Sequence, residues 1–348
     1  MPPAIQPSPA ARAAVIIAVL LLAAGAGCRG TGGTDGVDRI NRPSSADRAK
    51  KTAESLPKVT FLHETMPLGD VVRKVGEEVG GGLVLMGGLE EYSMPATDFR
   101  SATYEELANR FAGAVDGRVE PLANGYFIYP QGYDGLLALD LEGKLDGGIA
   151  GQSASIAFGA KTPLSNVFAV LSQSLGATLI VDNHLAEAVC GEMFLDNAPV
   201  PRILEAVLMS ARIAPGGFRV ESTGEYTFFF SVKNTNPPSV LLNGENLTGE
   251  QQALLDRKVT VVLPAPGANP VETAFAAKAT PLREVLTPLT RQLGIEVAAR
   301  RSMADIPINP CVFQNVRTRT VFELLIRQWP EQGYGFEVEG NRFLIREK

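Results

Sequence analysis

In this 348-residue chain, the residues whose types could bind a ligand or a metal or take part in catalysis are a glycine–lysine loop, two histidines and three cysteines. The loop at 159–162 reads Gly-Ala-Lys-Thr, residue types that can cradle a phosphate. A phosphate loop, however, needs glycine directly before the lysine and another glycine five residues earlier. Here an alanine separates the two, and Ala154 stands where the earlier glycine belongs. We therefore expect Lys161 and Lys278 to be surface residues beside helix starts.

Neither histidine has a companion His or Cys at the spacing of metal ligands. We expect His63 and His184 at the surface and predict no metal site and no cofactor. Cys190 and Cys311 are expected to be small, partly buried hydrophobic residues, with a disulfide between them as the minority alternative. Because no nucleophile, base and orienting group stand out together, no catalytic residue is predicted and a hydrolase is the weakest hypothesis.

Two aromatic stretches, at 126–129 and 226–230, are more promising for recognition than for catalysis. Alternate residues of a half-exposed sheet face the solvent, and an exposed aromatic row would allow docking or strand addition. The equally weighted alternative is that helices cover one face and a neighbouring module covers the other. The candidate interaction surface consists of Tyr126, Tyr129, Tyr226, Phe228 and Phe230.

Composition narrows the class of protein before any element is placed. The apolar content of 45% is ample for hydrophobic cores. A net charge of −6 argues against a nucleic-acid binder, which would carry a basic face. Three cysteines in 348 residues exclude a disulfide-dense scaffold.

The N-terminus is typical of an export signal. One arginine precedes an apolar run at 13–24 that is too short to span a bilayer, which needs about 20 residues. Small residues then lead to Cys28, an arrangement that resembles a bacterial lipoprotein signal, although Gly25 replaces the usual aliphatic residue. We predict a signal peptide at 1–27, lipid attachment at Cys28 and a flexible tether at 28–57, with outer-membrane anchoring facing the periplasm. A plain secretory signal is the alternative.

Three stretches specify the same kind of helix. Each starts with Pro-Leu, continues with apolar residues at i, i+3, i+4 and i+7, and ends at a glycine. We expect Thr162 and Thr280 to cap two of them, with proline at the first helical position. Pro288 lies inside the third helix and predicts a bend there. The helix stretches run from Met66 to Gly80, from Thr162 to Gly176 and from Thr280 to Gly294.

The elements around these helices recur in the order strand, helix, strand, strand, helix, strand, strand. The predicted fold class is α+β, with three tandem modules at 58–130, 152–232 and 270–348, each placing two helices on a small mixed sheet. Connectors are expected at 131–151 and 233–269. The second connector should hold a capped helix from Thr248 and a strand at 259–263, and the third module should begin with a strand at 273–276.

The pattern resembles the short N-terminal domain of secretins and TonB-dependent receptors, and the secretin N-domains. The match is carried by the Pro-Leu helix starts, the helix-ending glycines and the Val/Ile/Leu strands that follow at 83–85 and 179–181. It covers most of 58–348, and we expect this chain to lack the β-rich secretin barrel domain. The resemblance implies a non-catalytic periplasmic module that docks on its own kind or on envelope proteins.

The favoured hypothesis is therefore a non-enzymatic envelope lipoprotein that acts as a multi-module protein–protein interaction scaffold, as an accessory of a secretin-type secretion or pilus system. Its partners would be envelope proteins or further copies of the chain, together with the membrane through Cys28, and no nucleic acid. The alternative hypothesis is a ligand- or peptidoglycan-binding periplasmic protein that uses grooves between modules.

Overall fold

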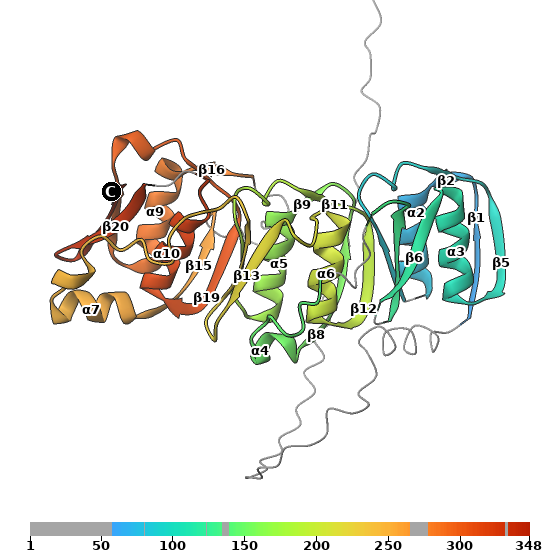
Figure 1. The fold of residues 1–348 in the computed structure, drawn as a ribbon, viewed down its shortest axis with the longest axis horizontal. Coiled ribbons are helices and arrows are strands. Elements are labelled where there is room, and N and C mark those ends of the chain that lie inside the picture. The colour runs from blue at the N-terminus through green and yellow to red at the C-terminus, as the bar shows by residue number, and fades with distance from the viewer. Residues whose placement is uncertain (1–57, 80, 123, 134–138, 265–277, 331–332) are drawn as a thin grey trace, which may run out of the picture.

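The computed structural model describes residues 58–79, 81–122, 124–133, 139–264, 278–330 and 333–348. Their helices and small mixed sheets make a mixed α/β architecture consistent with the predicted α+β class. Three groups of elements lie in a row, the N-terminal group at the right and the C-terminal group at the left (Figure 1). We call them the first segment (β1–β7), the second segment (β8–β14) and the third segment (β15–β21). The predicted signal peptide, Cys28 and the tether lie outside the described residues.

The first segment pairs its strands in three sets. β5 is antiparallel to β1, β4 pairs with β2, and β7 lies between parallel β3 and antiparallel β6. The elements are β1 (Val59–His63), β2 (Met66–Pro67), α2 (Leu68–Val79), β3 (Gly82–Leu85), β4 (Ser93–Met94), β5 (Thr97–Ala102), α3 (Tyr104–Ala114), β6 (Gly117–Leu122) and β7 (Gly125–Pro130).

The second segment follows a short helix, α4 (Gly147–Ala150), and pairs its strands in the same order. β12 is antiparallel to β8, β11 pairs with β9, and β14 lies between parallel β10 and antiparallel β13. The elements are β8 (Ser153–Phe158), β9 (Thr162–Pro163), α5 (Leu164–Leu175), β10 (Leu179–Val181), β11 (Val189–Cys190), β12 (Met193–Pro199), α6 (Val200–Ser210), β13 (Phe218–Ser222) and β14 (Thr227–Ser231).

The third segment follows a 3-10 turn, η2 (Gly244–Asn246), and the predicted capped helix α7 (Gly249–Asp256). Its first strand is β15, which we expected in the connector, and β15 is antiparallel to β19. The predicted strand at 273–276 lies outside the described residues. The remaining elements are β15 (Lys258–Leu263), β16 (Thr280–Pro281), α9 (Leu282–Leu293), β17 (Glu296–Ala299), η3 (Arg301–Met303), β18 (Pro307–Ile308), β19 (Cys311–Arg317), α10 (Thr318–Arg327), β20 (Tyr334–Glu339) and β21 (Arg342–Glu347).

The three proline-led helices begin one residue later than predicted. Thr162 and Thr280 are not caps, because each threonine hydroxyl donates to a nearby carbonyl and proline occupies the N-cap position without a side-chain cap. Backbone carbonyls replace the expected hydroxyls as acceptors for the first helical N–H groups. These bonds run from Leu68 to Tyr92 at 2.8 Å, from Leu164 to Ala188 at 2.8 Å and from Leu282 to Ile306 at 2.9 Å.

The helix ends follow the sequence more closely. Gly176 and Gly294 adopt the left-handed conformation with φ of 61° and 64° and close α5 and α9. Gly80 lies outside the described residues. α9 runs through Pro288 without a break in the assigned helix. α3 begins with a capping box, in which the Thr103 hydroxyl accepts from the Glu106 N–H and the Glu106 carboxylate accepts from the Thr103 N–H.

One backbone irregularity occurs in the pairing of β5 with β1, of β12 with β8 and of β19 with β15. The bulged residue has a positive φ although it is not glycine, and its N–H donates to a hydroxyl on the partner strand. These bonds are Ser101 to Thr60 at 3.2 Å, Asn197 to Ser155 at 3.0 Å and Asn315 to Thr260 at 3.2 Å.

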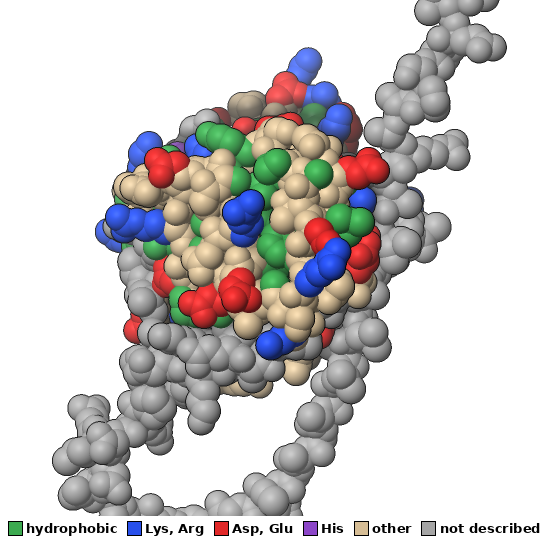
Figure 2. Space-filling model, turned by 90° about the vertical axis from the view of Figure 1, so that its right-hand side faces the viewer, with side chains coloured by type: hydrophobic (Ala, Val, Ile, Leu, Met, Phe, Trp, Pro, Cys, Tyr) green, Lys and Arg blue, Asp and Glu red, His purple; other side chains and the backbone are tan. Residues whose placement is uncertain are grey.

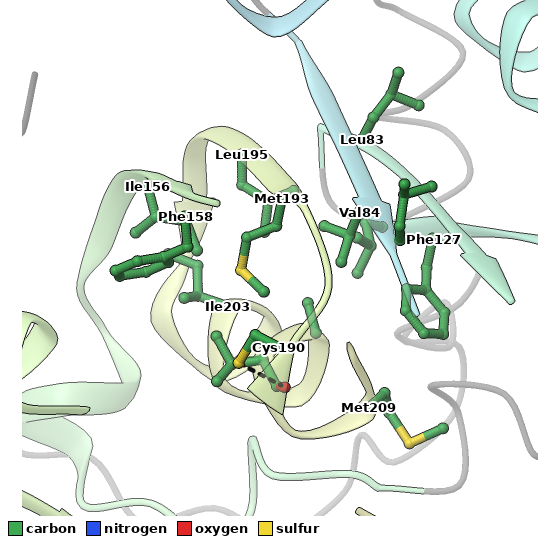
Figure 3. Close-up of a cluster of buried hydrophobic side chains, with 14 of the residues drawn as sticks. Leu83, Val84, Phe127, Ile156, Phe158, Cys190, Met193, Leu195, Ile203 and Met209 are labelled. Atoms are coloured by element: carbon green, nitrogen blue, oxygen red, sulfur yellow. Dashed lines mark hydrogen bonds between the residues drawn. The ribbon is translucent and has the colours of Figure 1, made fainter. Parts of the chain in front are cut away.

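Buried apolar side chains form two cores rather than three. One core is continuous across the first and second segments, and the other fills the third segment. The close-up in Figure 3 draws Val84 and Phe127 of the first segment beside Met193 and Ile203 of the second. At the boundary between the second and third segments, each contributes a side chain to the other's core: Phe228 packs in the core of the third segment, and Val312 packs in that of the first two.

Candidate functional site

The glycine–lysine loop at 159–162 contacts the first segment. Lys161 has a left-handed backbone, is exposed, and places its Nζ 2.6 Å from Glu91 Oε1. The Ala160 N–H donates to Glu192 Oε2 at 2.9 Å. The Lys161 side chain therefore reaches across a boundary between segments, and the loop amide is already used by a carboxylate of the chain itself.

The two histidines differ, and the expectation for His63 is wrong. His184 is exposed, whereas His63 is 2% exposed and packs against the rings of Phe61, Phe99 and Phe111. The signal was present in the sequence, because His63 has the same parity on β1 as the inward-facing Val59 and Phe61. The position of His63 in the inward–outward alternation of β1 therefore decides the burial of its side chain more strongly than the polarity of the imidazole does.

Cys190 and Cys311 are both free thiols buried in the structure. Burial raises the pKa of each thiol to about 12, so both stay protonated and unreactive near neutral pH. Among the described residues no cluster of three metal-binding side chains occurs. Within the same residues no helix is long and apolar enough to cross a membrane.

The aromatic residues of β7 do not form an exposed row. Tyr126 and Tyr129 are 4% and 8% exposed. Because they are three residues apart on a strand, they also point to opposite faces. Tyr129 stacks on Phe127 with ring centroids 5.3 Å apart, and burial raises the pKa of its hydroxyl. For β7, the alternative that the aromatic residues are covered within the chain therefore holds.

The aromatic residues of β14 do share one face, but that face is turned toward the third segment. Phe228 is buried there, and Tyr226 and Phe230 are half-buried against the same core. Phe228 and Phe230 stack with ring centroids 5.1 Å apart. The residues expected to bind an external partner are thus used within the chain.

The first junction, where β3 and α2 meet β12, is a continuous β-sheet. β12 is antiparallel to β3, with Met193 opposite Val84 and Phe194 opposite Leu83, which gives a five-stranded sheet in the order β6-β7-β3-β12-β8. Gly191 permits the close approach, because an added Cβ would lie 2.2 Å from the Leu85 carbonyl oxygen. The backbone itself therefore joins the first two segments.

Side chains reinforce the first junction on the α2 side. The Arg73 guanidinium donates from Nε and one terminal nitrogen to the two Glu192 oxygens at 2.9 and 3.0 Å. Phe194 packs onto Gly76, where an added Cβ would lie 2.4 Å from the ring. Asn124, in the β6–β7 turn, donates to the carbonyls of Asp196 and Asn197 at 3.0 and 2.8 Å. The Arg73 pair raises the pKa of the guanidinium, which keeps its charge.

The second junction, where β10 and α5 meet β19, has no shared sheet. β10 and β19 lie side by side but belong to separate sheets. Val312 is buried against the second segment, and the Gln314 N–H donates to the hydroxyl of buried Thr178 at 2.7 Å. Side chains therefore do most of the joining here.

The second junction contains an ion pair between a buried arginine and a partly exposed carboxylate. Arg327, on α10, is 5% exposed and donates to Glu221 Oε1 and Oε2 at 3.2 and 2.5 Å. Its guanidinium also lies 5.0 Å from the centroid of the Phe228 ring. The Tyr226 hydroxyl donates to the same carboxylate. Arginine, carboxylate and aromatic rings from two segments therefore pair with one another, and only the buried Arg327 Nε of this cluster is left without a hydrogen-bond partner.

The pKa values of this cluster follow from burial and pairing. Burial raises the pKa of Glu221, but the bonds from Arg327 and Tyr226 outweigh it and hold that pKa below its usual range. Burial, aided by the bond to Glu221, raises the pKa of Tyr226 to about 12. For Arg327, burial lowers the pKa and the bond to Glu221 more than restores it. The pair is ionised at neutral pH.

The connector after β14 is tied to the third segment by asparagines. Asn234 donates to Asp182 Oδ2 at 3.0 Å and to the Arg327 carbonyl at 2.8 Å, and Asn236 donates to the Trp329 carbonyl at 2.6 Å. Asp182 is fully buried and also accepts from backbone N–H groups. These bonds fix the end of α10 against the second segment.

A polar cleft of about 250 Å³ lies beside the second junction. Its wall comes from the end of α5, the β13–β14 turn and the strands β15 and β19. Glu225 is occupied by Arg317 Nε at 3.0 Å and by the Thr320 hydroxyl at 3.0 Å. The cleft lining includes the polar side chains of Asp146, Gln152, Thr223, Glu225, Lys258 and Gln314.

Sequence reasoning missed the pairs Arg73–Glu192 and Glu221–Arg327. Their partners are far apart along the chain, and each charge resembles an ordinary surface residue of a helix or strand.

No family model, curated protein or solved structure matches this chain.

Proposed function

We propose that the chain consists of three tandem copies of one interaction module, exported on a lipid anchor at Cys28, and that it acts as a non-enzymatic protein scaffold in the bacterial envelope. The copies are supported by the shared order of strand pairing and by the bulge at Ser101, Asn197 and Asn315 with its hydroxyl partner. The same unusual bulge at the same place in each segment favours repetition of one module over three unrelated ones.

The observation that supports a scaffold best is the shared sheet between β3 and β12. Strand addition is a general mode of protein recognition, in which main-chain bonds give affinity and alternate side chains give specificity. The first two segments recognise each other in this way. The resemblance to secretin and TonB-receptor N-terminal domains supports a periplasmic location for these modules and a role as accessories of a secretin-type secretion or pilus system.

The anchor is tested first. Mass spectrometry of the N-terminal peptide from the membrane fraction should find a lipid-modified Cys28. Cys28→Ser should remove the lipid and release the chain from the membrane fraction. A wild-type chain that is cleaved without lipid would contradict the anchor while leaving the scaffold open.

The scaffold is tested by crosslinking in envelope membranes. Chemical crosslinking of the membrane-bound chain, followed by purification and mass spectrometry, should recover either defined envelope proteins or the chain itself. Cys28→Ser, which carries the same segments without the anchor, is the control for contacts that depend on location. Recovery of neither partner class would overturn the proposal.

The polar cleft supports the second candidate function, binding of a ligand or peptidoglycan. Its carboxylate, amide and ammonium groups match the hydroxyls and amides of such a ligand. The chain should then sediment with purified cell wall, and Lys258→Ala with Gln152→Ala should reduce the bound fraction. If the double variant sediments like the wild type, the cleft is not the binding site.

A further inference from the structure

Both junctions use the same two edges. The edge of a three-stranded group, β3 or β10, meets the bulged strand of the next segment, β12 or β19. Among the described residues one edge of each kind has no neighbouring segment, namely β17 of the third segment and β5 of the first. β5 lies at the right end of the row, and the third segment, which contains β17, forms the left end (Figure 1).

The solvent-facing side of β1 and β5 carries an exposed apolar residue, Leu62, at a position whose counterpart in the third segment makes a contact at the second junction. Leu62 lies opposite Asp98, as Val262 lies opposite Val312 in the third segment. Val312 and Val262 pack against the second segment, whereas Leu62 is 72% exposed. Seen end-on, hydrophobic side chains form a broken stripe on this end, with charged side chains around it (Figure 2). An exposed leucine at a contact position indicates an unfilled contact.

Charge at the two ends is complementary. The first segment, 58–130, holds six Lys and Arg against eleven Asp and Glu, whereas the third, 258–348, holds twelve against nine. Asp98 takes the place of the contact residues Phe194 and Val312. On α9, the counterpart of α2 and α5, Arg291 is exposed, whereas the exposed Arg283 pairs with Asp305 and Glu284. Asp98 pairs with Arg100 of the same strand at 2.7 Å. A charge on an edge strand blocks indiscriminate pairing, so it is the net acidic charge of the first segment that favours a basic partner surface.

We propose that the first segment of one chain docks on the third segment of a second copy, with β5 added antiparallel to β17. The proposal rests on the three-copy reading above. The register of the first junction then places Thr97 opposite Ala298 and Asp98 opposite Val297. Leu62 shares a face with Asp98 and therefore with Val297, and the half-buried Leu286 of α9 is the apolar residue that it would contact there.

Such a contact joins two different surfaces and is therefore heterologous. Repeated head to tail, it produces open filaments, or rings if the rotation closes. Because exposed charges contribute to it, raising the salt concentration weakens it. The chain would then supply its own partner for the scaffold.

The test is a cysteine pair in the full chain, Thr97→Cys with Ala298→Cys, oxidised under mild conditions in the membrane-bound protein. We expect disulfide-linked dimers and larger species on non-reducing gels, and at least a fivefold loss of them in high salt. The native Cys190 and Cys311 are buried and do not compete. The matched control pairs Thr97→Cys with Ala253→Cys, an exposed position on α7.

A surface variant keeps the test falsifiable without disturbing the fold. Leu62→Lys in the cysteine-pair background should reduce crosslinking at least fivefold, whereas Val189→Lys, at a hydrophobic residue exposed to 45% on β11, should not. Equal crosslinking of both cysteine pairs, or none with Thr97 and Ala298, would overturn self-association. The scaffold proposal would then stand or fall on its envelope partners alone.

Discussion

At the first junction β3 and β12 share backbone hydrogen bonds, whereas at the second β10 and β19 are neighbours in separate sheets. The first junction has a bidentate pair, Arg73 with Glu192, in which the arginine is 46% exposed. The second has Arg327 with Glu221, in which the arginine is 5% exposed. In each pair one charge is buried and the other is partly exposed: Glu192 is 5% exposed at the first junction, and Glu221 is 31% exposed at the second. The buried charge is therefore the carboxylate where the strands share a sheet and the guanidinium where they do not.

This difference has an energetic consequence. Backbone pairing requires the two strands to lie about 4.8 Å apart, so the first junction depends on close approach at a few glycines. A buried ion pair gains little over a hydrophobic pair but is costly to break, because the remaining charge has no partner. The two junctions should therefore fail for different reasons, and the following variants separate them.

The largest effect is expected for Arg327→Met. The substitution leaves the Glu221 carboxylate without its partner. Because that side chain is 31% exposed, the loss of unfolding free energy should lie at the low end for a broken buried pair, about 3 kcal/mol. The fluorescence of Trp329, the single tryptophan and a buried residue beside this pair in sequence, reports the urea-induced transition. The double variant Arg327→Met with Glu221→Met should recover part of the loss. Equal stability of the single variant and the wild type would show that the pair contributes nothing.

A smaller effect is expected for Gly191→Ala at the first junction. The added Cβ meets backbone atoms of Leu85 and Gly87, so strands β3 and β12 must separate, at a cost of about 2 kcal/mol. Hydrogen exchange of the β3 and β12 amides should accelerate. Gly159→Ala, where the nearest atom is 4.0 Å away, is the matched control. Unchanged exchange in Gly191→Ala would contradict the shared sheet.

Acid should loosen the second junction by less than removal of Arg327. The folded-state pKa of Glu221 is lowered, so its stabilisation is complete above the unfolded-state value of about 4.3 and is lost as the pH falls through the lower folded-state value. The emission of Trp329 should shift in that acid window. Glu221→Gln should lack this component of the shift; if it titrates like the wild type, another group is responsible.

The smallest effect is expected for Lys161→Ala. Its ion pair with Glu91 crosses the first junction, but both side chains are more than 60% exposed. Exposed pairs contribute little, so the change in unfolding free energy should stay below about 0.5 kcal/mol. Lys278→Ala, at another surface lysine, should give a similarly small value. A loss above about 1 kcal/mol would mean that the junction relies on surface charge.

Local features were predictable because neighbouring residues decide them. The helix stripe of α9, the left-handed Gly294 and the capping box at Thr103 depend on residues within one or two helical turns. The helix starts were misplaced by one residue because carbonyls from a distant loop, not Thr162 or Thr280, accept the first N–H bonds.

The candidate site was less predictable than the elements that build it. The aromatic residues of β14 were identified, but the sequence could not show that the third segment covers Phe228. Glu221 and Arg327 are separated by 106 positions. Nothing within a local window distinguishes such a pair from two solvated charges, because desolvation depends on what else packs there.

The sequence by itself determined the kinds of element, their order and the periodic burial of their faces, since backbone propensity and hydrophobic spacing act over a few residues. Only the tertiary structure decided which strand edges meet, that β15 begins the third segment, and that one boundary is a shared sheet while the other includes an ion pair with a buried arginine. The physical reason is that edge pairing and desolvation depend on surfaces brought together from distant parts of the chain.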